Sequence, residues 1–385
     1  MIKSPFSSRE PQDFRILLFY PNLHMSALMP QVIGILTALF KREGYTIDLF
    51  DCTFYQDIDI INLGKNANEE RVANRNTSAY SNEEWSKRGG KPKWGIKEDI
   101  VKKIQEFKPD LILVSVLEST YFLAIELLNS VPQKDRNYKT LFGGVFATFA
   151  TDKVIKNEHV DYICRGEAED AVMEMCKKLC KGDRIDNVRN FTLKENGQIY
   201  KNPLRPAVDI NTVPIPDWDL FDVETYLKIG RKHSASNSWF YKPNEAIVMP
   251  INTARGCVFK CTFCHYVFWH DPYRHRSAGN VIAEIKQNQK KYKANFFNFW
   301  DELSFHKIGP ARKFVDELIK ADLKIHWTCA IRADLMGKDV DNKGNTIPRK
   351  ERLELAKQFL KSGCVSAGYS LESGSDEILE AMNKK

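Results

Sequence analysis

Apolar and polar positions alternate along the first 185 residues with two different periods. Phe14–Tyr20 is an almost continuous apolar run, which is typical of a strand buried on both faces of a parallel sheet. Ile96–Phe107 instead repeats its apolar residues every three or four positions, as one face of a helix does. The pattern predicts strands near Phe14–Tyr20, Thr46–Phe50, Leu111–Leu117, Thr140–Phe142 and Tyr162–Cys164. It predicts helices over Val32–Arg42, Ile96–Phe107, Tyr121–Leu128 and Glu169–Leu179.

This alternation predicts a doubly wound, flavodoxin-like α/β domain over residues 1–185. Residues from about 56 to 94 are polar and interrupt it, so we expect a surface insertion there. Residues 186–240 are predicted to be a linker, because a hairpin around Glu195–Gly197 is followed by a proline-rich, extended segment. The prolines of that segment are Pro203, Pro206, Pro214 and Pro216.

From residue 241 the alternation resumes with longer units and predicts part of a parallel (β/α) barrel over residues 241–385. The predicted strands are Ala246–Ile251, Asn295–Trp300, Lys324–Cys329 and Val365–Leu371. The predicted helices are Asn280–Tyr292, Ala311–Lys320 and Glu351–Lys361. Four parallel strands alone would leave an exposed edge, so we expect a barrel that is truncated at the C-terminus or completed by a partner.

Composition adds limits rather than a function. Hydrophobic content of 43% and charged content of 28% are ordinary for a soluble globular protein. The net charge of +7 is mild and spread along the chain, so it gives no indication of a nucleic-acid partner. The first ten residues lack the apolar core of a signal peptide, and no apolar run reaches the length that crosses a bilayer. Nine cysteines without such a signal indicate a reducing, cytoplasmic location.

Three of those cysteines are closely spaced after the first strand of the predicted barrel. Cys257, Cys261 and Cys264 have C-x3-C-x2-C spacing, whereas the other six are scattered and are expected to be buried as small apolar side chains. Three thiolates on one loop can bind three irons of a [4Fe–4S] cluster. The fourth iron then keeps an open coordination site, which is where chemistry can occur.

A zinc site is the alternative for this segment. Structural zinc takes four ligands, and His265, His270 and His275 follow the cysteines closely enough to supply the fourth. A closed zinc site would favour a non-enzymatic nucleic-acid-binding module. Iron and zinc analysis distinguishes the two hypotheses.

Charged residues follow the predicted barrel strands. In a parallel barrel the carboxyl ends of the strands carry the catalytic groups. Carboxylates and an arginine at that end can bind the ammonium and carboxylate groups of a zwitterion such as methionine. The candidates are Asp301, Glu302, Arg332 and Glu372, with Ser373 beside the last of them.

Small residues follow the strands of the first predicted domain. Glycines at strand ends let a bulky ligand approach the backbone, and serine hydroxyls can donate hydrogen bonds to it. The candidates are Ser115, Ser119, Gly143, Gly144, Gly166 and Glu167.

The cysteine spacing, with Phe263 before the third cysteine and an apolar strand before the loop, resembles the signature of radical S-adenosylmethionine (SAM) enzymes. In that family SAM fills the open iron site, and one electron from the cluster cleaves it to a 5′-deoxyadenosyl radical. The stretches 299–305 and 368–375 also resemble parts of radical SAM barrels that meet the methionyl group and the ribose or amino group of SAM. The resemblance therefore implies SAM contacts for Phe263 and for the charged strand-end residues.

The first domain resembles the cobalamin-binding domain of corrinoid enzymes. There, Ser-x-Leu-x-Ser/Thr and Gly-Gly line the channel for the nucleotide tail, as Ser115–Ser119 and Gly143-Gly144 would here. Many such proteins carry Asp-x-His-x-x-Gly, whose histidine binds cobalt from below. The corresponding stretch, residues 22–27, keeps His24 but lacks the Asp and the Gly, which weakens a prediction of cobalt ligation.

Together the resemblances imply a cobalamin-dependent radical SAM enzyme, and a methyltransferase in particular. In such enzymes the adenosyl radical removes hydrogen from an unactivated carbon, methylcobalamin supplies the methyl group, and a second SAM remethylates cobalt. The alternative is oxidative cyclisation or rearrangement, as in the anaerobic magnesium-protoporphyrin ester cyclases. Methylthiotransferases need three further cluster cysteines in the first domain, where only Cys52 precedes Cys164. Expected partners are a natural-product, lipid or tetrapyrrole substrate and an electron donor such as flavodoxin or ferredoxin.

Overall fold

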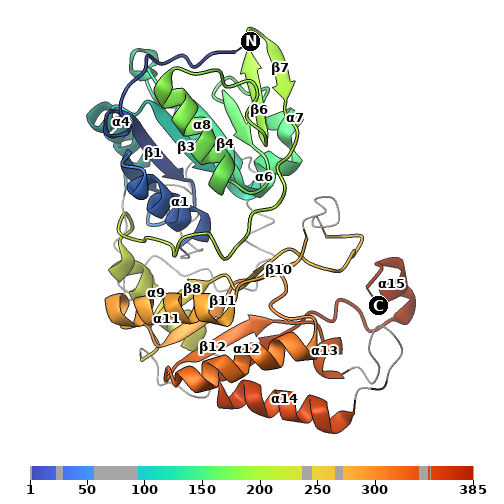
Figure 1. The fold of residues 1–385 in the computed structure, drawn as a ribbon. Helices are drawn as coiled ribbons and strands as arrows, with labels where there is room; N and C mark the ends of the chain where they lie inside the picture. The colour runs from blue at the N-terminus through green and yellow to red at the C-terminus, as the bar shows by residue number, and fades with distance from the viewer. Residues whose placement is uncertain are drawn as a thin grey trace. The chain divides into compact units, whose positions relative to one another are not determined.

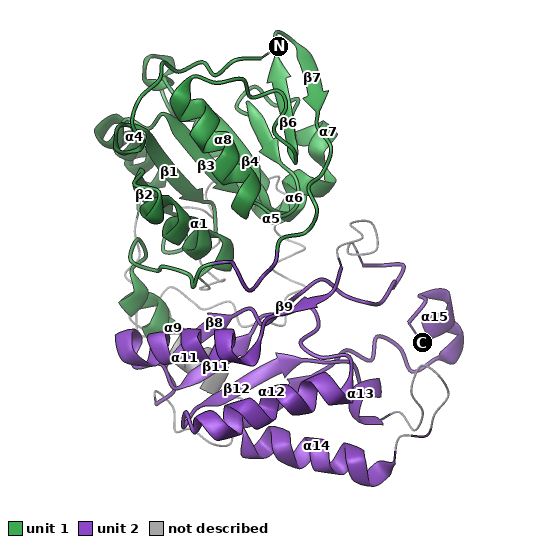
Figure 2. Cartoon of the chain, viewed as in Figure 1, with its two compact units in different colours: residues 1–208, 214–229 green, residues 209–213, 230–385 purple. Residues whose placement is uncertain are grey.

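The computed structural model describes residues 2–22, 29–55, 94–235, 245–264, 272–337, 346 and 348–384, without the side chains of 230–235. His24, His265, His270 and the predicted insertion, apart from Trp94, lie outside these residues. The chain divides into two compact units (Figure 2). Unit 1 comprises residues 1–208 and 214–229, and unit 2 comprises residues 209–213 and 230–385.

Unit 1 contains a seven-stranded sheet with the order β2-β1-β3-β4-β5-β6-β7. The first five strands are parallel, and their order is the one found in flavodoxin-like folds, so the predicted doubly wound domain is confirmed. The predicted hairpin exists as β6 and β7, but it pairs with β5 and extends the sheet. The strands are β1 Arg15–Tyr20, β2 Thr46–Asp51, β3 Leu111–Ser115, β4 Lys139–Gly143, β5 Tyr162–Cys164, β6 Phe191–Glu195 and β7 Gln198–Lys201.

Helices cover both faces of this sheet, as Figure 1 shows. Alternate residues of β1 face opposite layers, and Leu17 and Phe19 pack in one core cluster with residues of α4 and α5. α1 and α8 contact each other on the other face. The helices are η1 Pro11–Asp13, α1 Gln31–Arg42, α4 Ile96–Phe107, α5 Glu118–Asn129, η3 Gln133–Asp135, α6 Gly144–Phe149, α7 Thr151–Val154 and α8 Glu169–Lys181.

The second half of the predicted linker is built into unit 1 rather than extended as a tether. Trp218 is 1% exposed, and the Asp217 backbone N–H donates to the Gly34 carbonyl in α1 at 2.9 Å. Helix α9 (Val223–Ala235) follows, and its Tyr226 hydroxyl donates to Asp51 at the end of β2 at 2.7 Å. These contacts fix residues 217–226 against α1 and β2.

Unit 2 contains a parallel sheet with the order β13-β12-β11-β8, which confirms the predicted βα repeat. Its strands are β8 Val248–Ile251, β11 Phe296–Phe299, β12 His326–Ala330 and β13 Cys364–Gly368, with a separate antiparallel pair β9 Ala254–Arg255 and β10 Arg274–His275. Its helices are α11 Ala278–Tyr292, α12 Ile308–Ala321, α13 Asp334–Gly337, α14 Arg349–Lys361 and α15 Asp376–Ala381. The last predicted strand is too long. β13 ends at Gly368, which is the last residue that pairs with β12.

The helices of unit 2 lie along its sheet (Figure 1). Aromatic side chains pack in the core between them. Phe299 stacks on Trp327 with ring centroids 4.8 Å apart, and Trp327 contacts Phe359 of α14 at 5.4 Å. The Trp327 indole N–H donates to the Ser362 carbonyl at 3.1 Å, so its polar atom is satisfied in the core. Within the ranges given above, the helices are all too short or too polar to cross a membrane.

We predict that Gly34→Ala destabilises unit 1. A Cβ at Gly34 would lie 2.7 Å from Pro216 Cβ and 2.8 Å from the Trp218 ring, so residues 216–218 would have to move. Overpacking of this kind costs about 1–3 kcal/mol, which urea denaturation of the whole chain should show. Gly309→Ala in α12 is the control, because no atom lies within 4 Å of its added Cβ. Equal effects of the two substitutions would contradict the packing of residues 216–218 on α1.

Candidate active site

The loop that carries the three cysteines is closed at its base by backbone pairing. Ala254 and Arg255 of β9, just before the loop, pair with His275 and Arg274 of β10, just after it. Gly256 follows β9 with φ of +78°, a left-handed conformation that turns the chain into the loop. The cysteines thus lie on a segment whose two ends are held side by side.

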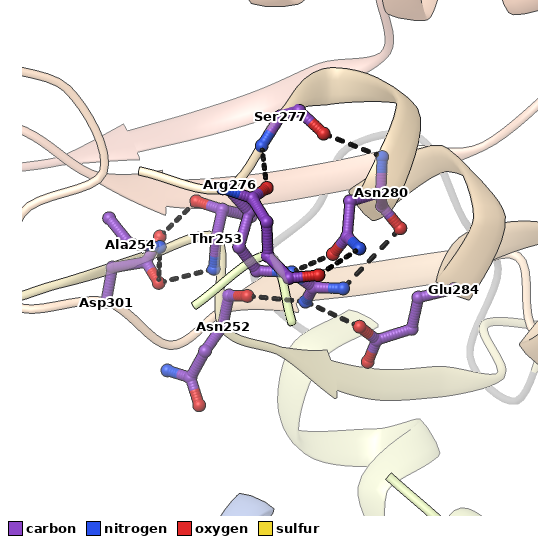
Figure 3. A network of polar contacts seen from close by, with 9 residues as sticks. Asn252, Thr253, Ala254, Arg276, Ser277, Asn280, Glu284 and Asp301 are labelled. Atoms are coloured by element: carbon purple, nitrogen blue, oxygen red, sulfur yellow. Dashed lines mark hydrogen bonds and ion pairs between the residues drawn. The ribbon is translucent and has the colours of Figure 1, made fainter. Parts of the chain in front are cut away.

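Asp301, two residues after β11, fixes the incoming end of the loop (Figure 3). Its Oδ1 accepts from the backbone N–H groups of Thr253 at 2.7 Å and Ala254 at 2.9 Å. Its Oδ2 accepts from the hydroxyls of Thr253 and Ser304. Burial raises the pKa of Asp301, and these hydrogen bonds oppose the shift because they stabilise the ionised form. The carboxylate therefore joins β11 to the residues directly before Cys257.

Arg276 and Glu284 fix the outgoing end of the loop (Figure 3). The Arg276 guanidinium donates to Glu284 Oε2 at 2.6 Å and to the Asn252 carbonyl at 2.8 Å, and its backbone N–H donates to the Thr253 carbonyl at 2.8 Å. The two side chains are only 10% and 0% exposed. Burial raises the pKa of Glu284, and the charge of Arg276 opposes this rise. The pair thus joins both ends of the loop to α11.

The three cysteines lie within eight residues of one another on one loop. All three residues are half-buried, and burial raises the pKa of Cys257, an effect to which the thiols of Cys261 and Cys264 add. The described residues contain no three His, Cys, Asp or Glu side chains that converge on a single ion. Cubane thiolates bind separate irons and need not converge in this way, so three cysteines on one loop fit a [4Fe–4S] cluster.

The segment after α15 holds the loop from another side. The Thr262 backbone N–H donates to the Met382 carbonyl at 2.9 Å, and the Asn383 side-chain amide donates to the Lys260 carbonyl at 2.9 Å. Lys260 and Thr262 flank Cys261. Backbone contacts from a segment more than a hundred positions away restrict the conformations that the loop can adopt.

The residues predicted to bind SAM have different surroundings. Glu302 and Phe263 are exposed, whereas Asp301 is buried in the hydrogen bonds described above. Glu372 lies four residues beyond β13 and accepts from Lys384 Nζ at 2.7 Å. Ser373 accepts from the Ser375 backbone N–H, and Arg332 contacts the ring of Phe259 in the cysteine loop. Their contacts with SAM stay predictions, and the internal roles of Asp301 and Glu372 were not visible in the sequence.

The residues predicted to bind cobalamin gather at the carboxyl ends of β3, β4 and β5. Ser115 and Gly143 are register partners. Gly144 has φ of +88°, and a Cβ there would lie 2.7 Å from the Val116 carbonyl oxygen. Gly166 donates its backbone N–H to Thr148 at 3.0 Å, and Ser119 is half-buried on α5. Glu167 accepts from the Val208 backbone N–H at 2.8 Å, which joins this edge to the segment that follows β7.

The sequence pattern did not predict an apolar surface that lies at the same edge. Four large apolar side chains are 41–54% exposed around the ends of β3 and β4, and α5 and α6, which carry three of them, contact each other. They are Leu117, Phe122, Val145 and Phe149. Exposed apolar clusters commonly mark binding sites, and a large, mostly apolar corrin would fit beside glycine backbone here. The available signal was the apolar residue at each strand end, where turns are usually polar.

His275, one of the candidate zinc ligands, packs inside unit 2. Its ring stacks on Phe305 with centroids 5.1 Å apart, and its Nδ1 lies 2.6 Å from the Arg276 carbonyl. Burial lowers the pKa of His275, which favours the neutral imidazole. These contacts hold the half-buried ring within unit 2.

Comparison with known families agrees with the geometry of both units. A family model described as B12 binding domain matches residues 86–175, and one described as Radical SAM superfamily matches residues 251–385. The chain carries both domains of the cobalamin-dependent radical SAM enzymes, in their order. The cofactors of these two domains are cobalamin for the first, and SAM with a [4Fe–4S] cluster for the second.

Individual relatives support the same family. The chain is 27% identical over 298 residues to the anaerobic magnesium-protoporphyrin IX monomethyl ester cyclase of Rubrivivax gelatinosus, across 75% of this chain and 49% of that protein. It is 25% identical over 289 residues to the uncharacterized methyltransferase PH0819 of Pyrococcus horikoshii, across 74% of this chain and 56% of that protein. This chain thus spans about half the length of these curated relatives.

A solved structure shows the same fold. The cobalamin-dependent S-adenosylmethionine radical enzyme OxsB, with aqua-cobalamin and S-adenosylmethionine bound, matches with a TM-score of 0.70 and 18% identity. The match covers 96% of this chain and 45% of that chain. Because the match spans both units of this chain, it confirms the fold that the sequence predicted for each of them.

We predict that losing one partner of the Arg276–Glu284 pair destabilises unit 2 more than losing both. Glu284→Leu would leave the Arg276 charge buried without its carboxylate, which typically costs about 3–5 kcal/mol. The double variant Arg276→Met, Glu284→Leu should recover much of that loss. Urea denaturation measures both. Glu317→Leu, which breaks the exposed pair with Lys320 on α12, is the control and should change little. A Glu284→Leu variant as stable as this control would contradict a buried ion pair between Arg276 and Glu284.

Proposed function

We propose that this chain contains the radical-generating and cobalamin-binding parts of a methyltransferase that acts on an unactivated carbon. The observation that carries the proposal is the loop with three cysteines, whose two ends are held by Asp301 and by the Arg276–Glu284 pair. The strand-end glycines and the apolar surface of unit 1 support a corrinoid as second cofactor. A relative described as a methyltransferase supports the reaction type.

The residues of this chain position the cofactors rather than perform the bond-breaking themselves. When bound, the cluster supplies the electron that cleaves SAM, and the corrinoid carries the methyl group. Cys257, Cys261 and Cys264 would hold the cluster with one iron open to SAM. Exposed Phe263, directly before Cys264, would contact the adenosyl part of SAM, and Glu302 and Arg332 would meet its amino and carboxylate groups.

Oxidative cyclisation is the second candidate, because a curated relative at 27% identity is a magnesium-protoporphyrin ester cyclase. The proposed substrate in either case is a small molecule, and the proposed electron donor is a flavodoxin or ferredoxin. We also propose a cytoplasmic location, since the free cysteines of the loop need reducing conditions.

The co-products of SAM distinguish the two reactions without knowledge of the substrate. The whole chain, reconstituted anaerobically with iron, sulfide and cobalamin, should convert SAM to 5′-deoxyadenosine on reduction. A methyltransferase should also form S-adenosylhomocysteine in proportion to bound cobalamin, because SAM supplies the methyl group that the corrinoid carries. 5′-Deoxyadenosine without S-adenosylhomocysteine would favour the cyclase alternative.

Replacing a cluster cysteine tests the radical step itself. Cys257→Ala, Cys261→Ala and Cys264→Ala should each lose iron and abolish 5′-deoxyadenosine formation, because the loop then offers two thiolates instead of three. Cys364→Ala is the control, since Cys364 is buried in β13 outside the loop. Retained SAM cleavage in any of the three loop variants would refute the assignment.

Neighbouring glycines separate cobalamin binding from folding in unit 1. A Cβ at Gly143 would meet its nearest atom at 3.9 Å, whereas one at Gly144 would lie 2.7 Å from backbone and at a positive φ. Gly143→Ala should therefore keep the stability of the unit and weaken cobalamin binding, measured by absorbance titration. Gly144→Ala should lower the stability itself. Unchanged cobalamin affinity in Gly143→Ala would contradict the placement of the corrinoid at this edge.

A further inference from the structure

Arg332 extends toward the cysteine loop from a backbone that is fixed on both sides. The Ile331 N–H donates to the Gly368 carbonyl at 2.9 Å, which continues the pairing of β12 with β13. The Arg332 carbonyl accepts from the Leu335 N–H at 3.1 Å as α13 begins. The side chain therefore starts from a defined position at the carboxyl end of β12.

The guanidinium of Arg332 lies over the ring of Phe259. Its Cζ is 3.8 Å from the ring centroid, well inside the roughly 6 Å range of cation–π attraction. Arg15, by comparison, lies 4.8 Å from the ring of Phe107. Arg332 Nε is also 3.5 Å from Asp334 Oδ1, and its side chain is 16% exposed. A cation held this way is screened less than one on a mobile surface side chain.

Phe259 belongs to the loop itself, between the first and second cysteines. Two positions separate Phe259 from Cys257 and two separate it from Cys261, so a displacement of Phe259 also displaces both neighbouring cluster ligands. The ring of this loop residue contacts the cation of Arg332. The geometry links the position of the cation to the conformation of the loop.

We propose that Phe259 and Arg332 form a cation–π clamp that fixes the cysteine loop and makes the cluster held there easier to reduce. The inference rests on the proposed function, because it requires a cluster on Cys257, Cys261 and Cys264. Reduction adds one electron from the external donor to the cluster and makes it more negative by one charge. A nearby, partly buried cation stabilises that added charge, and net charge and hydrogen bonds to sulfur are among the factors that set cluster potentials.

This role differs from the predicted contact of Arg332 with the SAM carboxylate, and the two are separable. A direct SAM contact depends on Arg332 alone, and its loss shows only when SAM is present. The clamp depends equally on Phe259, which carries no charge, and its loss shows in the cluster without SAM. Arg332 is then a positioning residue for the cluster.

The experiment is an anaerobic redox titration of the reconstituted chain without SAM, followed by electron paramagnetic resonance. Phe259→Leu, Arg332→Gln and their double variant are compared at the potential that half-reduces the wild-type cluster. Each single variant should show a several-fold smaller ratio of reduced to oxidised cluster. The double variant should fall no further than Arg332→Gln, because the two residues act as one unit.

Two variants serve as controls, and iron and sulfide content is measured for every sample. Phe259→Tyr keeps the aromatic face, and Lys260→Gln removes an exposed charge from the same loop, so both should titrate like wild type. Loss of iron in Phe259→Leu but not in Lys260→Gln would support the ordering role of the clamp. Phe259→Leu or Arg332→Gln with an intact cluster and wild-type titration would overturn the inference. A wild-type chain that binds no cluster would overturn the proposed function as well.

Discussion

A single buried carboxylate, Asp301, connects the sheet of unit 2 to the loop that carries its chemistry. It accepts from two backbone N–H groups and two hydroxyls, and the N–H donors lie directly before the loop. Hydrogen bonds to a charged group stabilise a fold by about 1.5–3 kcal/mol each, which is more than a hydrogen bond between neutral groups contributes. The Arg276–Glu284 pair secures the other end of the loop. Fixing both ends of the loop limits the positions that its three cysteines can adopt before a cluster binds.

The sequence predicted what local pattern determines. Apolar runs and 3.6-residue periodicity located most strands and helices, and the spacing of Cys257, Cys261 and Cys264 predicted the loop. The sequence could not predict that Asp301 accepts hydrogen bonds within unit 2, because its partners Thr253 and Ala254 lie 48 and 47 positions away. The sequence also predicted Glu372 at a strand end, whereas it lies four residues beyond β13. Only the pairing of β13 with β12 shows that the strand ends at Gly368.

Unit 1 shows the same limit in another form. Prolines suggested a linker, yet Trp218 is buried and Tyr226 donates to Asp51, contacts that depend on α1 and β2 far earlier in the chain. The glycines of the predicted cobalamin edge follow the strands directly in the sequence, and two of them, Gly144 and Gly166, have the positive φ that favours glycine. The exposed apolar side chains beside them became meaningful only when α5 and α6 placed them together. In each unit the residues of the predicted cofactor site can be found from the sequence, whereas the contacts that hold them in place cannot.

The central claim is that the cysteine loop holds a cluster with one iron open to SAM. Electron paramagnetic resonance of the reduced, reconstituted chain, recorded with and without SAM, tests it most directly. The account predicts the signal of a reduced [4Fe–4S] cluster whose shape changes when SAM is added, because SAM binds the iron that lacks a cysteine. A colourless protein that contains zinc and gives no signal, or a cluster signal that SAM leaves unchanged, would contradict it.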